Sequence, residues 1–501
     1  MTYPTLTHEA PMSRDPARRA APLWYGLIVF GSLFIGRQIA IGGPMLRVTV
    51  AVVAMVVLAI PAFERPKAAI TALFVLLPFL GIIRRMFLSS TGAAFLDPLL
   101  LLTSAVAITV LVALLLSDQL DFEGTTTSRV VFLLLAVGLL QVFNPGQASL
   151  LVGLTGIMIN LIPISFFFIA RSISDQQMTA RIVKIVSVVG VLAALYGLKQ
   201  VYFGLGTFDI AAGYTAATVG DTTRPLAFFN NASEYAAYAH IAFVMLFSTL
   251  LFRSKGTRRL WPLLAAGVVA YGGFLIGSRG FTVKVGLAII VVLALRARNR
   301  VLAAGIVVLL SSLAIGWSAT SSSDSRIEEK KEGAAQLIEN QQRALADPFD
   351  RSKSTLPIHF EAAWRGIWYG ITEHPAGLGT GVATRGGAKF GGLQAGTEFD
   401  VGDAFLALGV PGGVLYVAAI FFGIRGAARV RRAMPGAIWI AVYAIALTSV
   451  GAWLIGGNYS ITPLIWYLLG AADGMYKRLQ QGGLLDGPSK SSAPRPIPSV
   501  A

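Results

Sequence analysis

Long apolar runs alternate with short polar segments along most of the chain. Each run is long enough, within a few residues, to cross the roughly 30 Å of hydrocarbon in a bilayer as a helix. We therefore expect an all-α fold, a polytopic membrane helix bundle of about 12–14 spans. The pattern predicts spans at about 22–41, 47–63, 68–84, 97–117, 130–143, 149–170, 183–203, 235–252, 260–277, 280–296, 301–317, 403–424, 436–456 and 460–476.

One long segment between the spans, the predicted large loop 318–402, is compatible with water. Ser and Asp residues open a stretch with charges at helical spacing, which predicts a surface helix at about 325–346. A second helix begins near Ile358 and ends before Pro375. Its apolar and aromatic residues share one face, so we expect it to lie against the membrane surface or to cap a cavity.

The end of this loop is rich in glycine and then in acidic residues. Glycines recur from Gly377 to Gly396, and Glu398, Asp400 and Asp403 follow. Asp403 stands where we expect the next apolar helix to begin. An aspartate there serves either as a cap for the amides of the helix or as a carboxylate held at the membrane rim.

Composition agrees with a membrane protein. Of the 501 residues, 55% are hydrophobic and only 13% are charged, which is too apolar for a soluble protein of this length. The chain has no cysteine, which excludes a disulfide framework and a thiolate metal site. The net charge of +16 indicates membrane orientation and no nucleic-acid partner, because the cations gather on one side of the predicted spans.

The distribution of Lys and Arg predicts the orientation. Cytoplasmic loops hold the excess of these residues, which puts both termini in the cytoplasm and the large loop outside. No cleavage site follows the first apolar run, so we expect an uncleaved span. The predicted layout is a cytoplasmic N-terminal segment at 1–21, a transmembrane bundle at 22–317, the large outer loop at 318–402, further spans at 403–478 and a disordered cytoplasmic tail at 479–501.

A few cations fall on the outer flanks, against this rule. Some lie inside or at the edge of apolar runs, where a charge is costly and usually faces a cavity or a partner. Snorkelling to lipid headgroups explains any one of them equally well. As a set they favour an anion site at the outer leaflet, because arginine binds phosphate oxygens in pairs. These cations are Arg37, Arg47, Arg84, Arg85, Lys199, Arg224, Arg279 and Lys284.

Several short motifs follow one another in a characteristic order between about residues 224 and 415. They are Arg224 with Phe229-Asn230-Asn231, then Ser278-Arg279-Gly280, then Trp364 with His374-Pro375-Ala376-Gly377-Leu378-Gly379, then Asp403-Ala404-Phe405-Leu406 with Gly409-Val410-Pro411-Gly412. Because these motifs occur in this order beside one long outer loop, the chain resembles the O-antigen ligase and polysaccharide polymerase family of bacterial envelopes, the WaaL and Wzy types.

The chain also departs from the pattern of that family. The ligase branch carries a His where Asp403 stands, and the Asn usually beside it is Ala404. Where the family often has an Arg before the Trp, this chain has Phe360, with His359 adjacent. The asparagine-rich segment has Ala232 in place of its usual Pro. These differences favour a polymerase or a divergent relative.

The resemblance implies glycosyl transfer at the outer face of a bacterial inner membrane. The donor would be a polyprenyl-diphosphate-linked glycan, and the acceptor a glycan or a lipid-linked sugar. The departing diphosphate must be stabilised by positive charge that is already in place. Arg224 and Arg279 are the first candidates for this role, and Arg84, Arg85 and Lys284 are second candidates.

The acceptor hydroxyl must lose a proton to a positioned base. Asp403 is the first candidate, and His359 and Glu398 follow. Trp364, with Trp368 and Tyr369, would stack on sugar rings or belong to an interfacial aromatic belt. His374 and His240 are more typical of structural residues. No clustered His and Asp set indicates a metal, so we expect no cofactor.

Two other function classes stay open. A flippase or exporter of a lipid-linked glycan would also hold cations, although near the midplane and with repeated halves. A non-enzymatic scaffold would explain the spans but not the order of Arg224, Arg279 and Asp403.

Overall fold

The computed structural model describes residues 60–88, 101–206, 222–252, 260–297, 333–346, 356–382, 384–388, 390–393, 396–397, 399–452 and 460–482, with a few isolated positions before 60 and between 206 and 222. The predicted spans 22–41 and 301–317, most of 47–63, Arg37, Arg47 and Glu398 lie outside the described residues. The secondary structure of the described residues is mostly helical. It also includes a short β-ladder in which Thr218–Val219 (β1) pairs antiparallel with Thr222–Thr223 (β2).

The helices follow the predicted apolar runs closely. Among the described residues, six stretches are long and apolar enough to cross a membrane: Pro66–Arg85, Thr126–Phe143, Leu150–Ile173, Gln176–Tyr202, Ala232–Phe252 and Asp400–Ala433. Three shorter apolar helices also fall at predicted positions: α5 (Leu101–Leu116), α12 (Leu260–Phe274) and α19 (Ala437–Thr448). The described part of the chain is therefore a membrane-type helical fold.

Several of the long stretches contain more than one element. The first joins α3 (Pro66–Leu76), η1 (Leu77–Phe79) and α4 (Leu80–Leu88), and the second joins α6 (Thr126–Leu140) and η3 (Gln141–Phe143). The third joins α7 (Leu150–Gly156), the π-helical η4 (Ile157–Leu161) and α8 (Ile162–Ile173). The other helices are α9 (Gln176–Tyr202), α11 (Ala232–Phe252), α13 (Arg279–Arg296), α15 (Ala334–Ala346), α16 (Leu356–Thr372), α17 (Arg385–Ala388), α18 (Asp400–Ala433) and α20 (Thr462–Gln481).

Local polar residues explain where several helices begin. Thr125 accepts a hydrogen bond from the Ser128 amide at the start of α6. Asp175 does the same for the Met178 amide at the start of α9, at 2.6 Å. Such caps satisfy amides that have no partner within the helix. For that reason α6 begins four residues earlier than the predicted span and is long enough to cross a bilayer.

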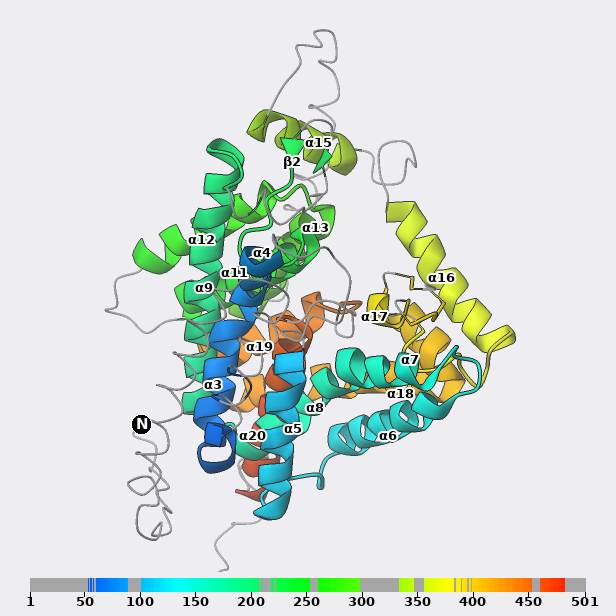
Figure 1. Ribbon diagram of the computed structural model, residues 1–501. Coiled ribbons are helices and arrows are strands. Elements are labelled where there is room, and N and C mark those ends of the chain that lie inside the picture. Colours follow the sequence, from blue (N-terminus) through cyan, green and yellow to red (C-terminus); the bar gives the residue numbers. More distant parts are fainter. Residues whose placement is uncertain are drawn as a thin grey trace, which may run out of the picture.

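The helices pack as two groups (Figure 1). In one group α11 contacts α9, α12, α13 and α19. In the other, α18 contacts α6 and α20, and α20 packs along α8 in the most extensive helix pair of the described residues. α18 and α20 also contact α19, which joins the groups. α16 runs along the outer edge beside α18 (Figure 1).

The longest helix, α18, is broken at Gly409, whose φ of 67° and ψ of −169° are not helical. The break lies two residues before Pro411. A turn from the predicted loop completes it: the amides of Leu378 and Gly379 donate to the carbonyls of Leu406 and Ala407, at 2.9 and 3.0 Å. These bonds satisfy carbonyls that the break removes from the helical ladder.

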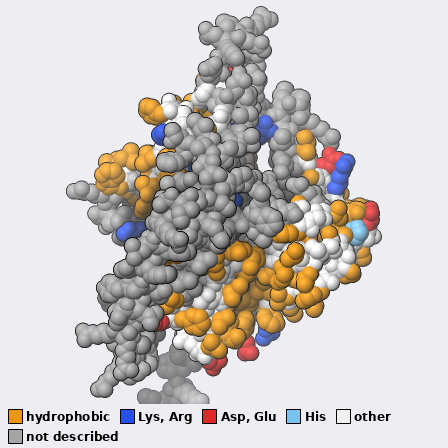
Figure 2. Space-filling view, in the orientation of Figure 1, with side chains coloured by type: hydrophobic (Ala, Val, Ile, Leu, Met, Phe, Trp, Pro, Cys, Tyr) orange, Lys and Arg blue, Asp and Glu red, His pale blue; other side chains and the backbone are white. Residues whose placement is uncertain are grey.

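Apolar side chains cover a broad surface over α5, α6 and α7, with charged side chains at its edges (Figure 2). Leu116, Leu140 and Phe143 are three-quarters exposed there. Exposed apolar area of this extent marks a surface that something apolar covers, which for a helical bundle of this composition is lipid.

Two sequence predictions need correction. α18 begins at Asp400, with Phe399 as its cap residue, so Asp403 does not cap the helix. The predicted tail 479–501 also begins too early, because α20 continues to Gln481. By contrast, α15 ends where predicted and α16 ends before Pro375, as expected.

Candidate functional site

The site is built around residues 224–231, the segment that leads into α11. Arg85, at the end of α4, is buried and donates hydrogen bonds to the backbone carbonyls of Ala227 and Phe229. It also lies 3.4 Å from the carboxylate of Asp209. The Gln200 side chain, near the end of α9, accepts from the Ala227 amide at 2.8 Å. Two helix ends thus hold the backbone of the segment in place.

Arg224 and Arg279 are brought together by this arrangement. The Nε of Arg224 donates to the Ile276 carbonyl at 2.8 Å, and Ile276 belongs to the tight turn that carries Arg279. Gly277 has a φ of 69°, a left-handed conformation that favours glycine, and Ser278 is the cap residue of α13. Burial lowers the pKa of Arg224, and the positive charge of Arg279 lowers it further. Both side chains remain partly exposed.

A third arginine, Arg84, reaches the same segment. Its guanidinium donates to the Oδ1 of Asn230, and the side chain is partly exposed. Arg84 and Arg85 therefore differ although they are adjacent. Arg85 is buried and binds the backbone of the segment, whereas Arg84, Arg224 and Arg279 are partly exposed.

Lys284 lies further along α13 than Arg279, about 7.5 Å along the axis at 1.5 Å per residue. It is partly buried, and the carboxylate of Asp400 attracts it. Asp400 is fully buried in the first turn of α18 and accepts a hydrogen bond from the Tyr416 hydroxyl at 2.9 Å. Lys284 thus lies within range of the charge of Asp400 at the start of α18.

Asp403 lies one turn into α18 and is partly exposed. Its Oδ1 accepts hydrogen bonds from the amide of Thr397 at 2.6 Å and from the Thr397 hydroxyl at 2.9 Å. The carboxylate therefore holds the end of the loop against the helix.

The aromatic residues of α16 point away from the bundle. Ala363, Gly366 and Gly370 pack toward α18, whereas Trp364 and Trp368 are 65% and 58% exposed on the other side. A helix that capped a cavity with its aromatic face would bury those rings, so the structure favours the alternative in which this face meets a surface. The backbone of His359 is in α16, but its side chain lies outside the described residues.

The two remaining histidines of this region have internal partners. His240 is buried and lies 3.0 Å from the Thr448 hydroxyl. The Nε2 of His374 lies 3.0 Å from the Tyr369 hydroxyl. Both contacts agree with the structural roles expected from the sequence.

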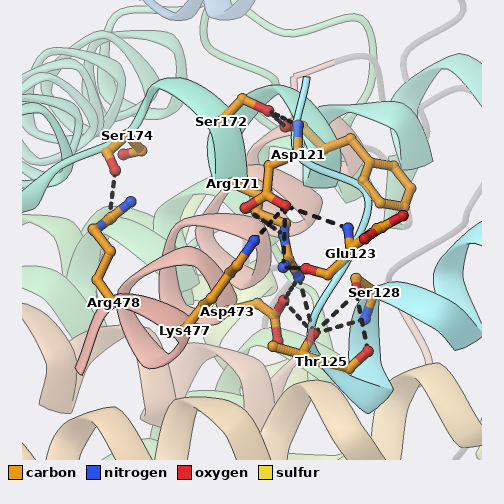
Figure 3. Close-up of polar contacts among 11 residues, drawn as sticks. Asp121, Glu123, Thr125, Ser128, Arg171, Ser172, Ser174, Asp473, Lys477 and Arg478 are labelled. Atoms are coloured by element: carbon orange, nitrogen blue, oxygen red, sulfur yellow. Dashed lines mark hydrogen bonds and ion pairs between the residues drawn. The ribbon is translucent and has the colours of Figure 1, made fainter. Parts of the chain in front are cut away.

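A second polar cluster lies at the opposite end of the helices (Figure 3). Arg171, at the end of α8, is buried between Asp473 and Asp121 and pairs with both carboxylates. Lys477 reaches Asp121 at 2.8 Å, and Thr125 donates to Asp473 at 2.7 Å. The two cations, Arg171 and Lys477, pair with the two carboxylates, Asp121 and Asp473. This cluster therefore holds the ends of these helices together.

The sequence pattern does not single out two carboxylates near the site. Asp400 is one of the acids at the end of the loop, and nothing in its spacing distinguishes it from Asp403. Glu234 is buried beside Asn230, and its signal was readable: Asn231-Ala-Ser-Glu234 has the spacing of a capping box.

Comparison with models of known protein families and with curated proteins finds no match to this chain. Arg224 and Arg279 lie close enough for their charges to interact, and Arg84 contacts the same segment through Asn230. Guanidinium groups placed in this way suit an anion with several oxygens, such as a diphosphate.

Proposed function

We propose that the protein is a membrane glycosyltransferase that polymerises polyprenyl-diphosphate-linked oligosaccharide units at the outer face of a bacterial inner membrane. The main support is the hydrogen bond from Arg224 to the turn that carries Arg279. It gathers two guanidinium groups from segments more than 50 residues apart in the chain. The order of motifs noted in the sequence agrees with this role.

The reaction requires little covalent help from the protein. An acceptor hydroxyl attacks the anomeric carbon of the donor glycan, the bond from that carbon to the diphosphate oxygen breaks, and the polyprenyl diphosphate leaves. The arginines stabilise the negative charge that develops on the diphosphate, because they are in place before it forms. Asp403 takes the proton from the acceptor hydroxyl.

The direct test is reconstitution of the full chain in proteoliposomes with a polyprenyl-diphosphate-linked oligosaccharide. We expect longer glycans, with one polyprenyl diphosphate released for each new glycosidic bond. Arg279→Ala and Arg224→Ala should each lower the rate about 10²- to 10³-fold, the usual effect of removing one preorganised charge.

Lys199→Ala is the matched control, because Lys199 is an outer-flank cation that, like Arg224, donates to a backbone carbonyl, that of Gly204, but has no part in the proposed reaction. It should retain the wild-type rate. Transfer of the glycan only to a different lipid acceptor would assign a ligase. Movement of the intact donor across the membrane, with no bond formed, would overturn the proposal in favour of a flippase.

A further inference from the structure

Glu234 is a carboxylate at the start of α11 that the proposed reaction does not use. It is only 1% exposed. Its Oε1 accepts hydrogen bonds from the Ser460 amide at 3.0 Å and from the Ser460 hydroxyl at 2.8 Å. One of its two oxygens is therefore committed to a residue more than 200 positions away in the chain.

The other oxygen faces the segment that carries the arginines. Oε2 accepts from the side-chain amide of Asn230 at 3.1 Å and from its backbone amide at 3.3 Å. In return, the side chain of Asn231, the residue before α11, accepts from the backbone amide of Glu234 at 2.8 Å and caps the helix. This cap does not involve the Asn230 side chain, so the bond from that side chain to Glu234 is additional.

That additional bond decides which way the Asn230 amide points. Oε2 of Glu234 is the acceptor of this bond, so the NH₂ of Asn230 faces Glu234. The carbonyl oxygen of the same amide then faces Arg84, whose guanidinium donates to it. Glu234 thus presents an acceptor to Arg84 through Asn230.

We infer that Glu234 is a positioning residue that aims Arg84 at the diphosphate of the substrate by fixing the orientation of the Asn230 amide. This inference rests on the proposed function. Glu234 itself does not touch the substrate, because it is buried and both of its oxygens already accept hydrogen bonds.

The test is the affinity of the full chain, in lipid nanodiscs, for farnesyl diphosphate as a probe. In Glu234→Gln, the backbone amide and the hydroxyl of Ser460 still donate to the side-chain oxygen of the introduced glutamine. The NH₂ of that glutamine then faces the NH₂ of Asn230. The Asn230 amide turns over and presents a donor to Arg84. We expect the Kd to rise about tenfold, equivalent to about 1.4 kcal/mol.

A double variant separates positioning from simple loss of packing. In Glu234→Gln with Asn230→Asp, the carboxylate introduced by the second substitution accepts from the introduced glutamine amide on one side and from Arg84 on the other. This restores the pattern with the same total charge and should return the Kd to within about threefold of wild type. Ser460→Ala is the control, since it removes a bond to Glu234 but leaves the Asn230 amide as it is, and its Kd should not change.

Three outcomes would overturn the inference alone: an unchanged Kd in Glu234→Gln, no recovery in the double variant, or an equal loss in Ser460→Ala. If the folded wild-type protein does not bind farnesyl diphosphate at all, the proposed anion site itself is wrong, and this inference with it.

Discussion

Individual arginines of the outer set have different roles that their sequence positions do not reveal. Arg84 and Arg85 are neighbours, yet Arg85 is buried against backbone carbonyls and Arg84 is accessible. Hydropathy predicts that a cation on that flank needs a partner, but it does not say whether the partner is the fold or a ligand. The sequence predicts that Arg224 and Arg279 serve one anion site, and in the structure Arg224 contacts the turn that carries Arg279. Their function stays a prediction.

Asp403 can be tested for catalysis separately from its structural contact. In Asp403→Asn one side-chain oxygen remains to accept both bonds from Thr397, so the free energy of unfolding should change by less than about 1 kcal/mol. The loss of a proton acceptor should lower the rate of glycan transfer about 10²- to 10⁴-fold. Unfolding by SDS titration and transfer in proteoliposomes measure the two effects. A wild-type rate in this variant would remove Asp403 from the mechanism.

At the scale of elements, the main feature is the way a loop turn completes a broken helix. The sequence shows Pro375 to Gly379 and Gly409 to Gly412 as separate motifs. In the structure they form one unit, because the Val410 amide donates to the Pro375 carbonyl at 2.9 Å beside the two bonds from Leu378 and Gly379. A break near Pro411 was predictable from composition. The contact with the turn was not, because it joins residues about 30 positions apart through backbone atoms alone.

Gly409→Ala tests this unit. The left-handed φ disfavours a side chain, and a Cβ at this position would meet the Pro375 carbonyl oxygen at 2.4 Å. We expect a loss of roughly 1–3 kcal/mol in the free energy of unfolding, measured by SDS titration. Gly267→Ala in α12 is the control, because nothing lies within 4 Å of its added Cβ. Equal stability of the two variants would show that the break does not depend on the turn.

At the scale of the whole molecule, the charged residues form two groups, one at each end of the helices. Lys67 and Asp175 pair at 2.8 Å where α3 and α9 begin, close to the ends at which Arg171 and Arg478 lie. Arg84, Arg224 and Arg279 lie at the other ends. The distribution of Lys and Arg predicts which of these ends faces the cytoplasm, because the rule acts on whole segments and needs no detail of packing, and this orientation stays a prediction. It did not predict that Arg171 is buried between two carboxylates, since Asp121 and Asp473 are distant in sequence.

The cluster around Arg171 predicts an acid-sensitive fold. Burial alone raises the pKa of Asp121, but the hydrogen bond from Lys477 and the charge of Arg171 outweigh it, so the pKa lies below its ordinary 3.8. A depressed carboxylate stabilises the folded state above the unfolded pKa, and that stability is lost as the pH falls through the folded pKa. Unfolding measured from pH 6 to pH 2 should show this loss below about pH 4, and Asp121→Asn should reduce it. An identical pH profile in the variant would contradict this assignment.

The central claim is that Arg224 and Arg279 bind the same diphosphate. A double-mutant cycle on farnesyl diphosphate affinity in nanodiscs tests it most directly, with Arg224→Ala, Arg279→Ala and the double variant. If both arginines hold one ligand, their effects are not additive, and we expect a coupling of about 0.5–3 kcal/mol. Additive losses, or no loss in either single variant, would show that the two arginines do not form one site.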